Sequence, residues 1–481
     1  MTPDVARHVA GRLRDDTVAF RRDPYRFISR RAAEADASVF ETRILLRRTH
    51  CMTGAAAAAV FSDPVRFQRA GAAPGPLQKT LFGRGGVQGL DGEQHRHRKA
   101  MFLGLTAPDR MDALRHRVRE EWRAASARWV DDGEVDLYAQ AQQLLTRAVC
   151  AWAGVPLREG EVATRTRQLS ALFDDAATVG IGHLRARAAR RGAERWAEDI
   201  VASIRAGVLQ TPGEGAAAVI ARHREVDGQL LTPRIAAVEL LNVLRPTVAT
   251  AVYTVFVVHA LDEHPEWRRR IAAGNASEDL AFLEEVRRHY PFFPAVAAIV
   301  REDFEWQGHH FRRGTRALLD LYGTNHDPRV WPEPFRFAPE RFLGPAPDRF
   351  AFVPQGGGDP AVHHRCPGEP ISLGVMGVVL DELTRRTSCS LAGPMGPVDL
   401  TRLPALPKGG CRVSSHGCVP TPRSGRSPSG RLTEEVAEPG PVGEPGLEEP
   451  GLDPHPGATS PQLPNHDPHP VQGLGVAGPA A

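Results

Sequence analysis

The chain has 481 residues, of which 42% are hydrophobic and 24% are charged. These fractions match those of globular proteins and exclude a collagenous, coiled-coil or wholly disordered chain. The net charge of +3 is too balanced to indicate a nucleic acid or an anionic membrane as partner. The six irregularly spaced cysteines do not fit a disulfide framework.

Neither a secretion signal nor a membrane span is expected. The first twenty residues lack the apolar core of a signal peptide. The longest uncharged apolar stretch, 246–261, is shorter than the ~18 residues that a membrane helix needs. The sequence therefore predicts a soluble, cytoplasmic protein with no integral membrane segment.

Helical patterns dominate the chain, and strand patterns are few. A strand-like segment occurs at 38–48, and residues 303–323 alternate like short strands around a glycine turn. Helices are predicted at 108–130, 134–154, 161–180, 184–207, 232–261, 278–289 and 370–386. Many helices with a minor sheet predict a mainly α, α-rich α+β fold.

A basic pair occurs in the segment DGEQHRHRKAMF. His95 and Lys99 are four residues apart, so they share one face of a helix. That face presents donors suited to a bound anion. Taken alone, a solvated basic face explains the pair equally simply.

The predicted helix 232–261 is central and buried, because its apolar residues occur on nearly all sides. Thr232 can cap it and Pro233 suits its first turn. Arg245 and Pro246 interrupt the apolar pattern. An internal proline kinks a helix at a cost of ~3 kcal/mol, and a buried arginine needs an anion. We expect a cavity at this kink and an anionic ligand at the guanidinium.

A second charged pair, Glu285 and Arg288, lies in FLEEVRRHYPFFP. The spacing of three residues places both on one helical face. They form either an exposed ion pair, worth less than ~1 kcal/mol, or a buried network with Arg341 of FAPERF.

Cys366 lies in the loop HHRCPGEP, directly before a predicted helix. Backbone N–H groups at a helix N-terminus favour a thiolate. Such a thiolate could serve as a nucleophile, a zinc ligand or a haem ligand, although a lone cysteine is ordinarily an inert apolar filler. No second cysteine lies at the spacing of a zinc site.

Composition changes sharply near residue 418. Residues 419–481 contain 14 Pro, 10 Gly and no aromatic residue, and they carry three Arg against eight acidic residues. Such a segment cannot bury enough apolar surface to offset its ordering entropy. The sequence predicts one domain over 1–418 and a disordered, acidic Pro/Gly-rich tail over 419–481.

Taken together, these motifs resemble those of the cytochrome P450 family. The E-x-x-R motif at 285–288, the P-E-R-F motif at 339–342 and the C-P-G loop at 366–368 follow one another in the family's order. The resemblance covers roughly residues 15–417. It implies a P450 fold, with the central helix lying across a haem b group and a small β region.

Two departures indicate a subclass. Asp359 and Val362 stand seven and four residues before the cysteine, where P450s usually have Phe and Gly. Arg245 and Pro246 stand where the central helix usually carries an acid–alcohol pair that delivers protons. Both departures resemble the fatty-acid peroxygenase branch. So do three stretches of sequence: 67–102, 287–294 and 355–358.

The resemblance implies a role for each candidate residue. Cys366 would be the thiolate ligand of the haem iron, and Arg245 would bind the carboxylate of a long-chain fatty acid. The remaining roles are propionate contacts for His95, Lys99 and His364, a structural network for Glu285, Arg288 and Arg341, and the pocket wall for Leu81, Phe82, Gln88, Phe292 and Pro246.

The implied reaction is hydroxylation of a fatty acid at Cα or Cβ with hydrogen peroxide. The central helix lacks its own acid, so the carboxylate held by Arg245 would serve as the acid–base group. Peroxide supplies both electrons and oxygen, so no redox protein is needed. In this branch a histidine at the site of Gln88 goes with decarboxylation, so glutamine implies hydroxylation with terminal alkene as a minor product.

Two alternatives remain open at this point. A P450 monooxygenase that depends on redox partners would need another proton-delivery group, and only Thr247 is nearby. A non-catalytic haem or fatty-acid-binding protein would carry the same cysteine and arginine without turnover.

Overall fold

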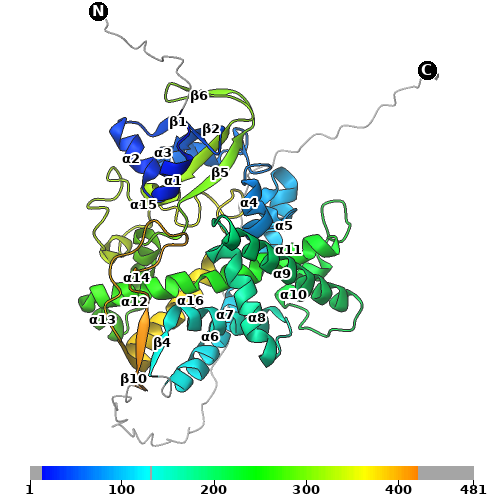
Figure 1. Ribbon diagram of the computed structural model, residues 1–481, viewed down its shortest axis with the longest axis vertical. Coiled ribbons are helices and arrows are strands. Elements are labelled where there is room, and N and C mark those ends of the chain that lie inside the picture. The colour runs from blue at the N-terminus through cyan, green and yellow to red at the C-terminus, as the bar shows by residue number, and fades with distance from the viewer. Residues whose placement is uncertain (1–13, 130–132, 421–481) are drawn as a thin grey trace, which may run out of the picture. The chain divides into compact units, whose positions relative to one another are not determined.

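Helices form most of the protein, with a small sheet beside them (Figure 1). The computed structural model describes residues 14–129 and 133–420. The predicted mainly α, α-rich fold is confirmed within these residues. Most of the acidic tail predicted at 419–481 lies outside them, so the tail and its boundary stay predictions.

The predicted helices occur, with shifted ends. Helix 161–180 ends at Asp174, and segment 134–154 begins as a strand before Asp136 caps the helix that follows. The helices are α1 (Thr17–Arg22), α2 (Phe27–Glu34), α3 (Ala55–Ser62), α4 (Gly75–Leu77), α5 (Gly92–Leu105), α6 (Pro108–Trp129), α7 (Leu137–Ala153), α8 (Glu159–Asp174), α9 (Ile181–Arg205), α10 (Ala216–Arg222), α11 (Pro233–Ala249), α12 (Ala251–Glu263), α13 (Pro265–Ala272), α14 (Ala276–His289), α15 (Leu321–Asn325) and α16 (Glu369–Asp381). Short turns of other helix types are η1 (Gln78–Phe82), η2 (Val87–Gly89), η3 (Pro339–Phe342) and η4 (Glu382–Arg386).

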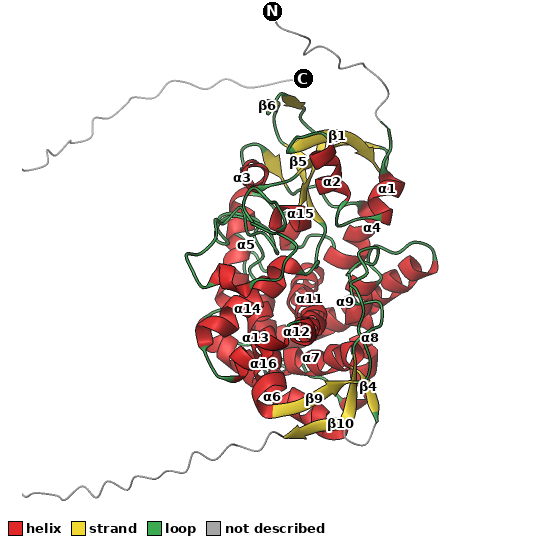
Figure 2. Ribbon diagram, turned by 90° about the vertical axis from the view of Figure 1, so that its left-hand side faces the viewer, coloured by secondary structure: helices red, strands yellow, loops and turns green. Residues whose placement is uncertain are grey.

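The strands gather into separate sheets. The largest has the order β1-β2-β8-β5-β3, in which β2 and β8 are parallel and the other pairs antiparallel. A second sheet, β4-β10-β9, lies at the opposite end of the helices (Figure 2). The strands are β1 (Val39–Ile44), β2 (Arg47–Met52), β3 (Phe67–Gln68), β4 (Glu134–Asp136), β5 (Ala295–Val300), β6 (Phe304–Trp306), β7 (His309–Phe311), β8 (Arg316–Asp320), β9 (Thr387–Leu391) and β10 (Arg412–Pro420).

The central helix is α11 followed directly by α12. Thr232 caps α11 by accepting a hydrogen bond from the Ile235 N–H, as predicted. The two helices meet at Thr250, four residues after Pro246, and the kink expected at Pro246 stays a prediction. The Thr250 N–H donates to the Thr247 carbonyl at 3.2 Å, which tightens this turn of the helix.

The segment Pro233–Glu263 contains an 18-residue window with a mean hydropathy of 1.5 and is long enough to cross a membrane. The expectation that no segment has this length was wrong, because it counted only the uncharged run after Arg245. That window is 94% buried inside the protein, as in a core helix. Apolar clusters from α6, α7, α9 and α16 cover it on several sides.

Candidate functional site

Cys366 lies in the loop that leads into α16. Its N–H donates to the Gln355 carbonyl at 3.0 Å, and its sulfur accepts from the Gly368 N–H at 3.4 Å. Burial raises the pKa of the Cys366 thiol, although the Gly368 N–H and Lys99 oppose this shift. The N–H group at the helix start thus favours the thiolate, as predicted, but in the protein alone burial has the larger effect on the thiol pKa. A bound metal ion would deprotonate the thiol outright.

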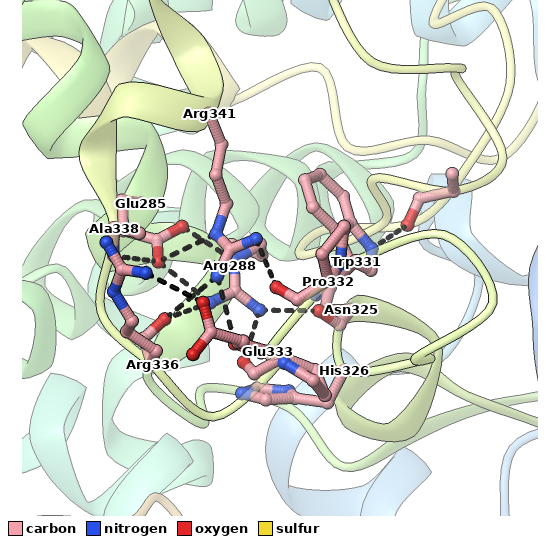
Figure 3. A network of polar contacts seen from close by, with 12 residues as sticks. Glu285, Arg288, Asn325, His326, Trp331, Pro332, Glu333, Arg336, Ala338 and Arg341 are labelled. Atoms are coloured by element: carbon pink, nitrogen blue, oxygen red, sulfur yellow. Dashed lines mark hydrogen bonds and ion pairs between the residues drawn. The ribbon is translucent and has the colours of Figure 1, made fainter.

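A network of polar contacts joins Glu285, Arg288 and Arg341 (Figure 3). Arg288 binds both carboxylate oxygens of Glu285, at 2.6 and 2.8 Å, and both side chains are fully buried. The Ala338 N–H donates to Glu285 at 2.7 Å, and Arg341 Nε lies 3.6 Å from the same carboxylate. An exposed ion pair is therefore the wrong interpretation of Glu285 and Arg288, and the buried network is confirmed, because neither side chain is exposed to water.

The remaining donors of Arg288 bind backbone carbonyls. Its Nη1 donates to Asn325 and Pro334, each at 2.9 Å. Arg341 likewise donates to the Glu333 carbonyl at 2.9 Å. The network therefore fixes the segment between α15 and η3 against α14.

His95, Lys99 and His364 lie together beside the cysteine loop. The rings of His95 and His364 stack with their centroids 3.8 Å apart. Lys99 donates to the carbonyls of His363 and Arg365, the latter at 2.6 Å. His95 and Lys99 are buried, so a solvated basic face is the wrong interpretation of this pair.

Burial lowers the pKa of each basic group here: His95 to about 3, His364 to about 4 and Lys99 to about 8. The histidines are thus neutral near pH 7. Asp91 lies 3.5 Å from His364 Nε2. Burial opposes the shift of Asp91, but hydrogen bonds from His364 and from backbone N–H groups lower its carboxyl pKa.

Arg69 joins this group and was missed by the sequence analysis. Its backbone N–H donates to Asp91 at 2.9 Å, and its guanidinium lies over the Phe61 ring at 4.2 Å. Burial lowers the pKa of Arg69 to about 10. The only sequence signal was a basic residue directly after β3.

Arg245 lies on α11 and is 5% exposed. Its one hydrogen bond, from Nη2 to Asn242 Oδ1, is long at 3.5 Å, and its buried Nε has no partner. Burial, helped by the positive charge of Arg190, lowers the pKa of Arg245 to about 9. This guanidinium can take an anion as its missing partner. The cavity expected beside it stays a prediction.

The predicted pocket residues come from four parts of the chain, of which Pro246 on α11 is one. Leu81 and Phe82 end the η1 turn, and Gln88 lies on η2. Phe292 follows α14 and stacks on Tyr253 of α12, with centroids 4.6 Å apart. Leu81, Phe82 and Phe292 all pack against the apolar cluster that contains much of α11.

Gln88 belongs to a polar chain that the sequence analysis also missed. Asn242 donates to Gln88 Oε1 at 3.2 Å and to Glu239 at 2.8 Å. Glu239 in turn accepts from Arg98 at 3.0 Å.

These residues fit a haem group. Cys366 is half-buried, Arg245 on the central helix has no partner for its Nε, and Arg69 and Lys99 bring positive charge beside the cysteine loop. A thiolate ligand with cationic partners for propionates is the donor set that haem b requires. Among the described residues, no cluster of His, Cys, Asp or Glu is arranged to hold a bare metal ion.

Comparisons with known proteins agree with this geometry. The model of the family "Cytochrome P450" matches residues 280–402. The putative cytochrome P450 137 of Mycobacterium tuberculosis is 25% identical over 349 residues, which are 68% of this chain and 71% of that protein.

Solved structures extend the similarity over the whole described body. Cytochrome P450SP alpha (CYP152B1), solved with (R)-ibuprofen, is 48% identical, with a TM-score of 0.82 over 83% of this chain and 98% of that chain. Cytochrome P450EX alpha (CYP152N1), solved with myristic acid, is 40% identical, with a TM-score of 0.81 over 84% and 97%. Cytochrome P450 OleT is 29% identical, with a TM-score of 0.81 over 84% and 98%.

Proposed function

This chain belongs to the cytochrome P450 family and to its fatty-acid peroxygenase branch, and from that premise we propose that it hydroxylates long-chain fatty acids at Cα or Cβ with hydrogen peroxide. The observation that carries the proposal is Arg245. Its buried guanidinium lacks a partner at Nε and has only a long bond at Nη2. A carboxylate is the ligand that satisfies such a fork in two places.

Haem b, when bound, supplies the oxidising chemistry of the reaction. Cys366 would hold its iron, with the Gly368 N–H on the sulfur limiting the charge there. His95, Lys99, His364 and Arg69 would hold the propionates. Lys99 would then replace one of its hydrogen bonds to a carbonyl of the cysteine loop by a hydrogen bond to a propionate oxygen.

Proton transfer falls to the substrate. A carboxylate held by Arg245 can accept a proton from hydrogen peroxide at one oxygen and return it from the other. Thr247 is the hydroxyl that a conventional monooxygenase would need here, but it is buried and donates to the Val243 carbonyl at 2.9 Å. Its hydroxyl proton is thus engaged within its own helix and is not available for proton delivery. This disfavours a monooxygenase that depends on redox partners.

Arg245 would also set the position of attack. Fixing the carboxylate limits which carbon reaches the oxidant, so Cα and Cβ are favoured. The hydrocarbon chain of the fatty acid would be enclosed by Pro246, Leu81, Phe82 and Phe292. Gln88 favours hydroxylation over decarboxylation, with terminal alkene as a minor product. A cytoplasmic location stays a prediction.

The deciding experiment is product analysis with a saturated C14 acid and peroxide alone. We expect 2- or 3-hydroxy acids, with both forms quantified against any terminal alkene. Product that forms only with NAD(P)H and a reductase would instead support the conventional monooxygenase.

A carrier without turnover is tested by spectroscopy together with that assay. The reduced, CO-bound protein should show the red-shifted Soret band of a thiolate, and Cys366→Ser should lose it. A thiolate spectrum and fatty-acid binding without any product would establish the carrier. An unshifted band in the wild type would refute ligation by Cys366.

A further inference from the structure

The fully buried acid Glu239 lies on α11, about two turns before Arg245. It accepts from Arg98 Nη1 at 3.0 Å through one oxygen and from Asn242 Nδ2 at 2.8 Å through the other. Burial raises the pKa of Glu239, while Asn242, Arg98 and the Val87 backbone oppose that shift. Because the Arg98 guanidinium binds it, Glu239 acts as an acceptor through both of its carboxylate oxygens.

Asn242 lies between this acid and the two residues assigned to the substrate. Its amide nitrogen has two hydrogens, and both are engaged, one by Glu239 and one by Gln88 Oε1 at 3.2 Å. Its Oδ1 therefore faces Arg245 Nη2. A carboxylate cannot donate, so Glu239 admits only this orientation of the amide.

The surrounding backbone is shaped to this pair. A Cβ on Gly86 would lie 2.9 Å from both Asn242 Nδ2 and Gln88 Oε1, closer than real Cβ atoms approach. Arg98 also donates to the Gly85 carbonyl at 2.6 Å. The turn that carries Gln88 is thus held by the same arginine that holds Glu239.

We propose that Glu239 is a positioning residue for the substrate carboxylate: by fixing the amide of Asn242, it aims Oδ1 at Arg245 and the Gln88 carbonyl oxygen at Asn242. Arg245 is then oriented by one weak acceptor and keeps its other donors for the substrate. The amide nitrogen of Gln88 is left to face away from Asn242. This inference rests on the proposed function of Arg245 as the carboxylate site.

Glu239→Gln tests the proposal, because it keeps the size of the side chain and adds a donor. Asn242 can then turn its amide nitrogen toward Arg245, and because both groups are donors, Arg245 loses its acceptor. In the haem-loaded protein we expect the dissociation constant for a C14 acid, measured by the haem spin shift, to rise about tenfold. The ratio of 2- to 3-hydroxy product should change as well, and binding of imidazole, which has no carboxylate, should not.

Glu225→Gln is the matched control. Glu225 is the other acid on Arg98, but no hydrogen bond joins it to Asn242. The Glu225→Gln variant should bind the C14 acid, and divide its product between the 2- and 3-hydroxy acids, much as the wild type does. Equal loss in both variants would assign the effect to the charge of Arg98 and overturn the proposal. So would acid binding within about twofold of wild type in Glu239→Gln.

A second variant covers a failure of Glu239→Gln to fold. Asn242→Leu keeps the pair of Glu239 with Arg98 and removes only the amide, so it should weaken acid binding to a similar extent, and unchanged binding overturns the proposal. Peroxide-dependent turnover by the wild type is recorded separately. Its absence contradicts the proposed function, whereas the acid-binding comparison still decides the role of Glu239.

Discussion

Two buried arginines among the candidate site residues differ in how their donors are used. Arg288, on α14, binds both oxygens of Glu285 and several backbone carbonyls. Arg245, on the central helix, has one long bond and an unpartnered Nε. The saturated arginine belongs to the architecture, whereas the unsaturated one is suited to a ligand. Burial alone does not separate the two roles, because both side chains are almost completely covered.

The largest effect is expected at the saturated arginine. Arg288→Ala leaves Glu285 buried without its main partner, so the free energy of unfolding should fall by about 3–5 kcal/mol. Urea unfolding, with haem content measured in parallel, checks this. Arg288→Lys should recover little, since lysine cannot bind both oxygens. A loss below about 1 kcal/mol would mean that the network is not structural.

The unsaturated arginine should behave in the opposite way. Arg245→Leu should lower turnover of a C14 acid by about 100-fold, because the substrate carboxylate loses its charge partner. The free energy of unfolding should stay unchanged or rise, because a buried group without a partner destabilises the folded state. Product yield and urea unfolding are measured on the same preparation. Normal turnover in this variant would refute Arg245 as the carboxylate site.

A third region, where His364 meets Asp91, adds a pH effect to the comparison. The pKa of His364 is lowered to about 4 by burial, against about 6.5 when unfolded. The unfolded chain therefore takes up a proton that the folded chain resists, and stability falls as pH drops from 6.5 to 4.

Allowing for partial exposure, this histidine contributes about 2 kcal/mol to that loss in the haem-free chain. His364→Asn should flatten the dependence when unfolding is measured across the same pH range. Identical profiles for the two proteins would contradict the assignment. Haem should reduce the effect, because propionates favour the protonated ring.

The smallest effect is expected at the rim of the Arg288 network. The Arg336 side chain pairs with Glu333 at 2.7 Å, but both are exposed, and only the backbone carbonyl of Arg336 reaches Arg288. Arg336→Ala should change the free energy of unfolding by less than about 1 kcal/mol. A change as large as that of Arg288→Ala would mean that the rim charges also stabilise the network.

Local patterns allowed the fold class to be predicted and the candidate residues of the site to be selected. Glu285 and Arg288 lie one helical turn apart, and Cys366 lies in a loop of unusual composition. Arg245 stood out as a charge on an apolar helix. Each of these signals is contained in a short segment, so no knowledge of tertiary contacts was needed.

What escaped prediction depends on contacts between distant segments. Asn242 meets Gln88 across 154 positions of the chain, and Arg98 meets Glu239 across 141. No local period reveals such pairs. The boundary between α11 and α12 was not predicted either, and it lies where the Thr250 N–H donates to the Thr247 carbonyl.

The long apolar segment formed by α11 and α12 has a consequence for synthesis of the protein on the ribosome. The apolar residues of α12 pack against those of α16, which begins about 120 residues later in the chain. At ~5–20 residues per second, α12 waits on the order of ten seconds for that partner. During this interval a segment with the hydropathy of a membrane helix is without its final cover. Growth at a lower temperature, or added chaperones, should therefore raise the yield of folded protein more than substitutions of its surface residues do.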